Sequence, residues 1–167
     1  MKTKTFIVKS IQILSIVFLL GMLYVNYLSL GAYFNGVTIA DVSDKYMTLF
    51  TPAPITFAVW SFIYLGLFMY VFWQIKTLLY SQYVKAVDGV VEKIGLLFLL
   101  TCVFNSLWIV AWHYDKLLYS VIIMTAQLWT LVKINRRISL QLPATPQYKL
   151  FLKMPFGIYL GDRKSVV

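Results

Sequence analysis

Long runs without a charged residue alternate with short charged segments along the chain. The first run holds 31 residues between Lys9 and Asp41, and the second holds 30 residues between Lys45 and Lys76. A helix needs about 20 consecutive apolar residues to cross the hydrocarbon core of a bilayer. The pattern therefore predicts four membrane-spanning helices, at residues 11–33, 55–75, 94–114 and 117–134.

The later apolar segments are shorter. Only 16 uncharged residues separate Lys116 from Lys133, but Lys133 can extend its ammonium group to the headgroups and let the helix continue. A loop that carries Pro146 follows, and the last apolar stretch, 154–161, is too short to cross a membrane. We expect an all-α, multi-pass transmembrane helical bundle with four complete helices and the start of a fifth, in one membrane domain over residues 1–167.

The composition agrees with this interpretation. Hydrophobic residues make up 60% of the chain and charged residues 13%, against about 45–50% and about 25% in a soluble domain. Mean hydropathy is +0.77, and a soluble domain of this size cannot hide so much apolar surface from water. Among the aromatic residues, Trp112 and Tyr114 are interpreted as rings at the membrane boundary. The single Cys102 excludes an intramolecular disulfide and a metal site made of paired cysteines.

The net charge of +9 comes from basic residues that flank the apolar runs. With the amino terminus in the cytoplasm, thirteen Lys and Arg residues, Arg163 and Lys164 among them, fall on the cytoplasmic side. Only Lys45 and Lys116 fall on the other side. This imbalance is the positive-inside pattern of a multi-pass protein in the cell membrane. It makes the lipid bilayer the expected partner of the chain, and not a nucleic acid.

Few charged residues could carry chemistry. The predicted spans contain no charged residue apart from Lys133 at one end. The chain therefore lacks the buried carboxylate on which a proton pump or an ion-coupled transporter relies. Asp41 and Asp44, three residues apart, could hold a cation, but we interpret them as turn or cap residues. We interpret His113 as a solvated residue at the interface rather than a metal ligand. No catalytic motif occurs, so neither catalytic residues nor a metal site are predicted.

Two groups of residues are candidates for a ligand site. Phe57, Trp60 and Tyr64 are three and four residues apart and share one face of the second predicted helix. Asn105 and Trp108 share a face of the third. An amide in the middle of a membrane must find a hydrogen-bond partner, because leaving it unsatisfied is costly. The two groups either hold helices together or line a ligand pocket. Spacing alone favours the first interpretation and leaves the second open.

The same residues carry a resemblance to a known family. The run F-T-P-A-P-I-T-F-A-V-W-S-F-I-Y at residues 50–64 resembles the start of the second helix in TspO/MBR proteins, the tryptophan-rich sensory or translocator proteins. The run N-S-L-W at 105–108 is similar to N-x-x-W on the third helix of that family, and P-F-G-I-Y at 155–159 resembles the opening of its fifth. The order and spacing of these motifs agree over most of the chain.

The resemblance implies a five-helix membrane bundle that binds a tetrapyrrole such as protoporphyrin or haem, or in some members a sterol. It implies no required cofactor, and it leaves a homodimer open. The ligand-binding residues would be Phe57, Trp60, Tyr64, Asn105 and Trp108. A loop at residues 41–51 would form the lid, with an entry made by Asp41, Asp44, Pro52 and Pro54. Some bacterial members promote light-dependent breakdown of protoporphyrin, but the residues themselves give no argument for an enzyme.

The sequence departs from the family pattern in two places. The fifth helix of the family continues after the position of Tyr159, whereas here Gly161 is followed by D-R-K-S-V-V. We therefore expect a truncated or frame-shifted copy whose pocket lacks one wall. In addition, Phe57 lies one place closer to the tryptophan than in the family, and Ile55 follows Pro54, which leaves ligand specificity open. The alternatives are a membrane transport or channel subunit, and an inactive membrane fragment.

Overall fold

The computed structural model describes residues 2–45, 58–79, 84–142 and 145–166. These residues fold into helices and contain no strand, which confirms the predicted all-α class. In chain order the elements are α1 (Lys2–Leu30), α2 (Ile39–Lys45), α3 (Ala58–Leu79), α4 (Val84–His113), α5 (Leu117–Gln141), α6 (Pro146–Tyr148), the π-helical segment η3 (Lys149–Lys153) and α7 (Met154–Val166).

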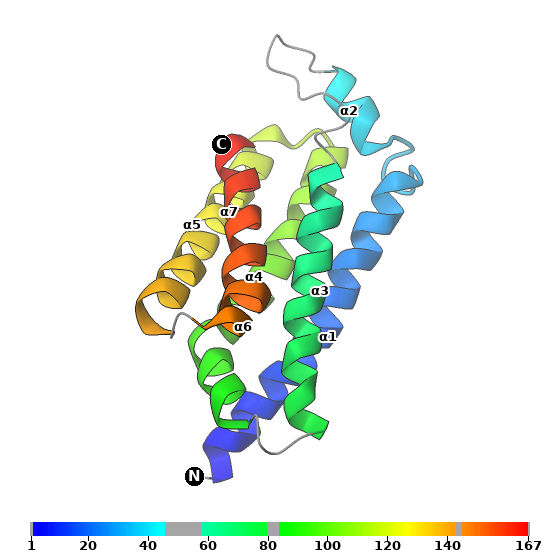
Figure 1. Ribbon diagram of the computed structural model, residues 1–167. Coiled ribbons are helices and arrows are strands. Elements are labelled where there is room, and N and C mark those ends of the chain that lie inside the picture. Colours follow the sequence, from blue (N-terminus) through cyan, green and yellow to red (C-terminus); the bar gives the residue numbers. More distant parts are fainter. Residues whose placement is uncertain (1, 46–57, 80–83, 143–144, 167) are drawn as a thin grey trace.

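Helix α4 lies between α1 and α5 in an elongated bundle (Figure 1). It packs along α1 and along α5, while α7 packs against α5 and α3. Within the most apolar window of each helix, 50% of α4 is buried inside the bundle, against 33% for α1 and for α5. A larger share of α4 is therefore buried between helices than of α1 or α5.

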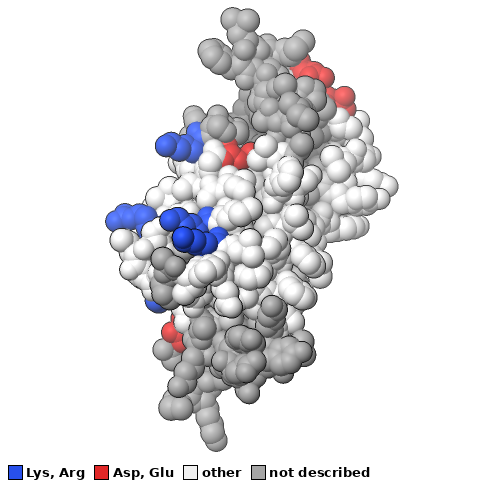
Figure 2. All heavy atoms as spheres, in the orientation of Figure 1, with Lys and Arg blue, Asp and Glu red and all other residues white. Residues whose placement is uncertain are grey.

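Three of the described helices are long and apolar enough to cross a membrane, namely Phe6–Leu30, Val87–His113 and Leu117–Gln141. Helix α3 carries a shorter apolar stretch, Val59–Ile75. Large apolar side chains such as Phe62 and Leu118 are exposed on the outside of the bundle. Figure 2 shows a surface over α1 and α3 that is almost free of charged side chains. An exposed apolar surface of this extent is what a bilayer covers, so the chain is a multi-pass membrane protein.

The helices extend beyond the predicted spans. Helix α1 begins at Lys2 rather than near residue 11, and α4 begins at Val84 rather than near residue 94. The segment after residue 134 continues as α5 to Gln141. Apolar runs mark the part of a helix that lies in lipid, and its polar ends can continue into the headgroups. At this end of the bundle the Lys93 ammonium group donates a hydrogen bond of 2.6 Å to the Gln141 carbonyl oxygen.

The fifth helical segment is longer than the sequence suggests. Helix α7 begins at Met154, as expected, but it continues past Gly161 to Val166. It also follows α6 and η3 without a break, so elements of 3, 5 and 13 residues form one helical segment of 21. A segment of that length covers about 30 Å. Its start lies in the stretch that we interpreted as a loop, where Thr145 is the N-cap and Pro146 the first residue.

This longer segment changes the assignment of two basic residues. The sequence analysis placed Arg163 and Lys164 at the same end of the bundle as the amino terminus, which is wrong. The fifth segment extends toward the end of the bundle that is opposite the amino terminus, and its carboxyl end lies there (Figure 1). The Lys and Arg residues of the chain thus divide eleven to four, rather than thirteen to two, between the two ends. The end of the bundle that holds the amino terminus still carries most of the basic residues.

Gly66 sets how closely α7 approaches α3. A Cβ atom added at Gly66 would lie 2.8 Å from Cβ and 3.2 Å from Cα of Pro155. Real Cβ atoms do not approach so closely, and a proline cannot swing its ring away as a flexible side chain can. Small residues allow helix backbones in membranes to pack at short range. Gly66 therefore brings the residues of α7 against those of α3 and α4.

Candidate functional site

Asn105, near the middle of α4, is the centre of a buried hydrogen-bond network. Its side chain is completely buried. The Asn105 Oδ1 atom accepts a hydrogen bond of 2.9 Å from Asn26 Nδ2, and Asn105 Nδ2 donates one of 3.2 Å to the Tyr159 hydroxyl. The sequence analysis predicted that this amide must find a partner, and the structure confirms it. The two bonds join α4 to α1 and to α7.

The network extends to the other two long helices. The Tyr64 hydroxyl on α3 donates to Asn26 Oδ1, and Gln127 Nε2 on α5 donates to the Tyr159 hydroxyl. Asn26 uses both of its amide hydrogens, because Nδ2 also donates to the Met22 carbonyl oxygen at 2.7 Å. A single chain of hydrogen bonds thus links α3, α1, α4, α7 and α5. Such a chain fixes the relative positions of the helices that surround it.

An aromatic cluster lies beside this network. The rings of Trp60 on α3 and Trp108 on α4 meet edge to face, with 5.8 Å between centroids and 77° between planes. Trp108 also stacks on Trp112, with 6.0 Å between centroids and 24° between planes. Offset-stacked and edge-to-face pairs are the arrangements that aromatic rings favour. The three indole rings form one continuous group, which we call the tryptophan cluster (Trp60, Trp108 and Trp112).

Arg163, near the end of α7, covers the tryptophan cluster. Its Cζ atom lies 4.8 Å from the centroid of Trp108 and 5.6 Å from that of Trp60. It also lies 5.6 Å from the ring centroid of Tyr159, one turn earlier on the same helix. Only 1% of Arg163 is exposed. The guanidinium group is therefore held in an aromatic environment by cation–π contacts.

Several polar atoms around the site are buried and have no hydrogen-bond partner among the described residues. They include Trp108 Nε1, Gln127 Oε1, His113 Nε2 and Arg163 Nε. Trp108 Nε1 is a donor and Gln127 Oε1 is an acceptor. Buried polar groups usually have partners, so groups that lack one are candidates for contact with a ligand or with water.

The structure brings together four of the residues singled out from the sequence. Trp60 and Trp108 belong to the tryptophan cluster, and Tyr64 and Asn105 belong to the hydrogen-bond network. The remaining ligand-site candidate, Phe57, and the entry residues Pro52 and Pro54 lie outside the described residues. Trp112 was interpreted as a boundary ring like Tyr114. It is partly buried and stacks on Trp108, whereas Tyr114 is 48% exposed.

His113 is buried and not solvated, which corrects the sequence-based interpretation. Its Nδ1 atom lies 2.7 Å from the Ile109 carbonyl oxygen, one turn earlier on α4. The ring of Phe34 packs against the imidazole edge to face, at 5.6 Å between centroids. Asn35 Nδ2 donates a hydrogen bond of 3.1 Å to the His113 carbonyl oxygen. The turn after α1 thus covers His113, which lies at the end of an apolar run in the sequence.

The acidic pair in the predicted lid caps a helix. The Thr38 amide donates to Asp41 Oδ2 at 2.7 Å, and the Asp41 amide donates to Thr38 Oγ1 at 3.2 Å. This reciprocal arrangement is a capping box at the start of α2. The hydrogen bonds from Thr38 lower the pKa of Asp41 below its ordinary value. Asp44 is exposed. No group of three metal-ligating side chains occurs within the described parts of the chain.

An exposed ion pair connects α2 to the α4–α5 turn. The Lys45 ammonium group contacts Asp115 Oδ2, and the side chains are 56% and 38% exposed. Screening by water makes such pairs weak, at about 0–1 kcal/mol. This contact places α2 beside the end of α4 without fixing it there.

Sequence reasoning missed four residues of the site. Asn26 and Gln127 lie inside apolar spans, and an isolated amide in such a span is a signal that could have identified both. Tyr159 was named only as part of a motif. Arg163 was only counted among the basic residues on the cytoplasmic side, and its burial depends on a helix that extends beyond the last apolar stretch.

Comparison with known proteins identifies the family. The family model described as TSPO-like protein matches residues 12–161. The match includes every residue of the hydrogen-bond network, from Asn26 to Tyr159, and it ends two residues before Arg163. No curated protein and no solved structure matches the chain. Since the match covers far more than half of the sequence, this membrane bundle belongs to the TSPO-like protein family.

Proposed function

We propose that the protein binds a flat hydrophobic ligand of the tetrapyrrole type against the tryptophan cluster. The observation that carries this proposal is the contact between the indole rings of Trp60 and Trp108, which Arg163 covers. These rings lie beside the hydrogen-bond network that links α3, α1, α4, α7 and α5. The family resemblance supports it, because the same tryptophans match the motifs of tetrapyrrole-binding relatives. Binding, and not a chemical reaction, is the role that these side chains favour.

The physical basis is a combination of stacking and preorganisation. A macrocycle gains contact area from aromatic faces, and a rigid site loses little entropy when the ligand binds. Asn26 joins the two helices that carry Trp60 and Trp108, because it is hydrogen-bonded to Tyr64 on α3 and to Asn105 on α4. Because Arg163 covers both rings, a ligand that stacks on them must move this side chain.

Binding is measured by titrating protoporphyrin into protein in lipid nanodiscs and following the absorption band of the porphyrin itself. Trp108→Phe keeps a ring but loses contact area and the indole N–H group. An aromatic pair contributes about 0.5–1.5 kcal/mol, so we expect an affinity about two- to tenfold weaker. Following the porphyrin band avoids the change in protein fluorescence that the loss of any tryptophan causes.

Trp129→Phe is the matched control. Trp129 lies on α5, is 56% exposed, and contacts Lys133 rather than the tryptophan cluster. We expect its substitution to leave the affinity unchanged. The proposal is wrong if wild-type protein does not bind the porphyrin at micromolar concentrations, or if both substitutions weaken binding equally.

A further inference from the structure

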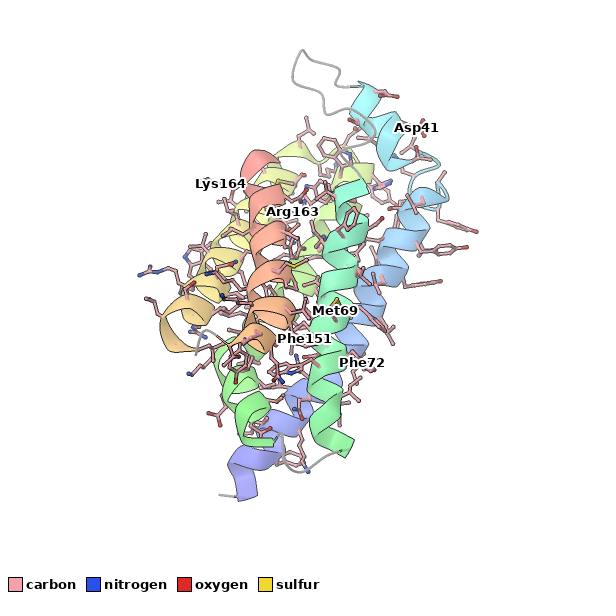
Figure 3. All side chains as sticks on the ribbon, in the orientation of Figure 1. Asp41, Met69, Phe72, Phe151, Arg163 and Lys164 are labelled. Carbon is pink, nitrogen blue, oxygen red and sulfur yellow. The ribbon has the colours of Figure 1, made fainter. Side chains whose placement is uncertain are left out.

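Arg163 is a fully buried cation. It lies near the end of α7, where its neighbour Lys164 is exposed and carries the same charge (Figure 3). Burying a charge is costly unless it is paired and hydrogen-bonded. Arg163 must therefore be compensated by the groups around it, and those groups can be named.

The compensation that the described residues provide is incomplete. The carboxylate that the structure pairs with Arg163 is that of the adjacent residue, Asp162, whose Oδ2 atom lies 3.4 Å from Arg163 Nε. Side chains of adjacent residues on a helix do not face each other, so this pair cannot adopt the two-pronged geometry that a guanidinium favours. Arg163 Nε makes no hydrogen bond to any described residue. The Asp162 carboxylate also forms a hydrogen bond with the Trp60 side chain.

A second buried donor lies on the ring that Arg163 covers. Trp108 Nε1 is buried and has no acceptor among the described residues. The Arg163 Cζ atom lies 4.8 Å from the centroid of this ring, so the cation and the indole N–H group belong to one small region. Both groups donate and neither can accept a hydrogen bond. A site that presents two donors and a positive charge is suited to an acceptor with a negative charge.

We propose that Arg163 is the specificity-determining residue of this site and selects flat ligands that carry a carboxylate. The ligand ring contacts the tryptophan cluster, and its carboxylate replaces Asp162 as the partner of the guanidinium group. This inference rests on the proposed function, because it takes the tryptophan cluster as the binding surface. A carboxylate binds a guanidinium through two parallel hydrogen bonds, which an ester of the same acid cannot reproduce.

The experiment compares protoporphyrin, which carries two carboxylates, with its dimethyl ester in the same nanodiscs. Charge-assisted hydrogen bonds discriminate strongly, so we expect wild-type protein to bind the acid about tenfold or more tighter than the ester. In Arg163→Gln the preference is expected to disappear, because the acid loses affinity while the ester does not. Lys164→Gln is the matched control and is expected to keep the full preference.

Arg163→Lys keeps the charge but loses the planar fork, and its preference for the acid is expected to be intermediate. Arg163→Lys also replaces Arg163→Gln as the test variant if the latter fails to fold, which circular dichroism would show. The inference is overturned if wild-type protein binds acid and ester equally, or if Arg163→Lys and Arg163→Gln both keep the full preference. Tighter binding of both ligands to Arg163→Gln also overturns it, since Arg163 would then only obstruct the site. If neither ligand binds wild-type protein, the proposed function itself fails.

Discussion

Replacing Asn105 with leucine tests whether the buried network holds the bundle together. The substitution keeps a side chain of similar size but removes the hydrogen bonds to Asn26 and to Tyr159. Hydrogen bonds between membrane helices are worth about 0.6 kcal/mol on average and about 1.7 kcal/mol at most. The loss of two bonds therefore predicts a decrease of about 1–3 kcal/mol in the free energy of unfolding. Asn26 keeps its bonds to Tyr64 and Met22, which limits the loss.

The free energy of unfolding is measured by titrating SDS into protein in mixed micelles and following helicity. A double-mutant cycle with Asn26→Leu isolates the bond between the two amides. We expect a coupling energy of about 0.6–1.7 kcal/mol. Ser106→Ala is the control, because the Ser106 hydroxyl bonds only to the Cys102 carbonyl oxygen within its own helix, at 3.0 Å. A coupling energy near zero, or an equal loss in Ser106→Ala, would refute the reasoning.

Two further predictions concern the packing of α7 and the start of α2. Gly66→Ala should force α3 and α7 apart at Pro155 and lower the free energy of unfolding by about 1–3 kcal/mol in the same SDS titration. Gly21→Ala, whose added Cβ atom meets nothing within 4 Å, should not lower it, because alanine is favoured over glycine inside a helix. Because the pKa of Asp41 is lowered in the folded protein, its contribution to α2 is complete above the ordinary carboxyl pKa and is lost as pH falls through the lowered value. Hydrogen exchange of the α2 amides should therefore become faster when the pH is lowered, both in the wild-type protein and in the control Asp44→Asn. In Asp41→Ala the exchange should be fast already at neutral pH. Equal pH dependence of exchange in all three proteins would contradict this prediction.

The membrane architecture could be predicted from the sequence because it depends on the length of apolar runs. Charge-free stretches located the central parts of α1, α3, α4 and α5, since a bilayer imposes the same length on every span. The same rule located the ends of the helices poorly. Polar residues such as Lys93, whose ammonium group binds the Gln141 carbonyl oxygen, extend a helix beyond the lipid, and no apolar run marks that part of the helix in the sequence.

The candidate site was only partly predictable. That Asn105 needs a partner follows from its place in an apolar run, but which amide approaches it depends on how the helices rotate against one another. Asn26 became its partner through the packing of α1 on α4, which no local pattern encodes. Arg163 was assigned to the wrong end because the segment before Met154 was read as a loop. The Thr145–Pro146 pair, an N-cap followed by proline at the first helical position, was the overlooked signal.

The position of Tyr159 in the chain affects how the bundle is assembled. Its hydroxyl accepts hydrogen bonds from Asn105 and from Gln127, yet it lies on α7, which is synthesised after α4 and α5. During biosynthesis α4 and α5 therefore enter the membrane with amide groups whose shared acceptor does not yet exist. The ribosome must make more than a dozen residues after Gln127 before α7 can supply this acceptor. The hydrogen bonds from Asn105 and Gln127 to Tyr159 can therefore form only after α7 has been synthesised and has packed into the bundle.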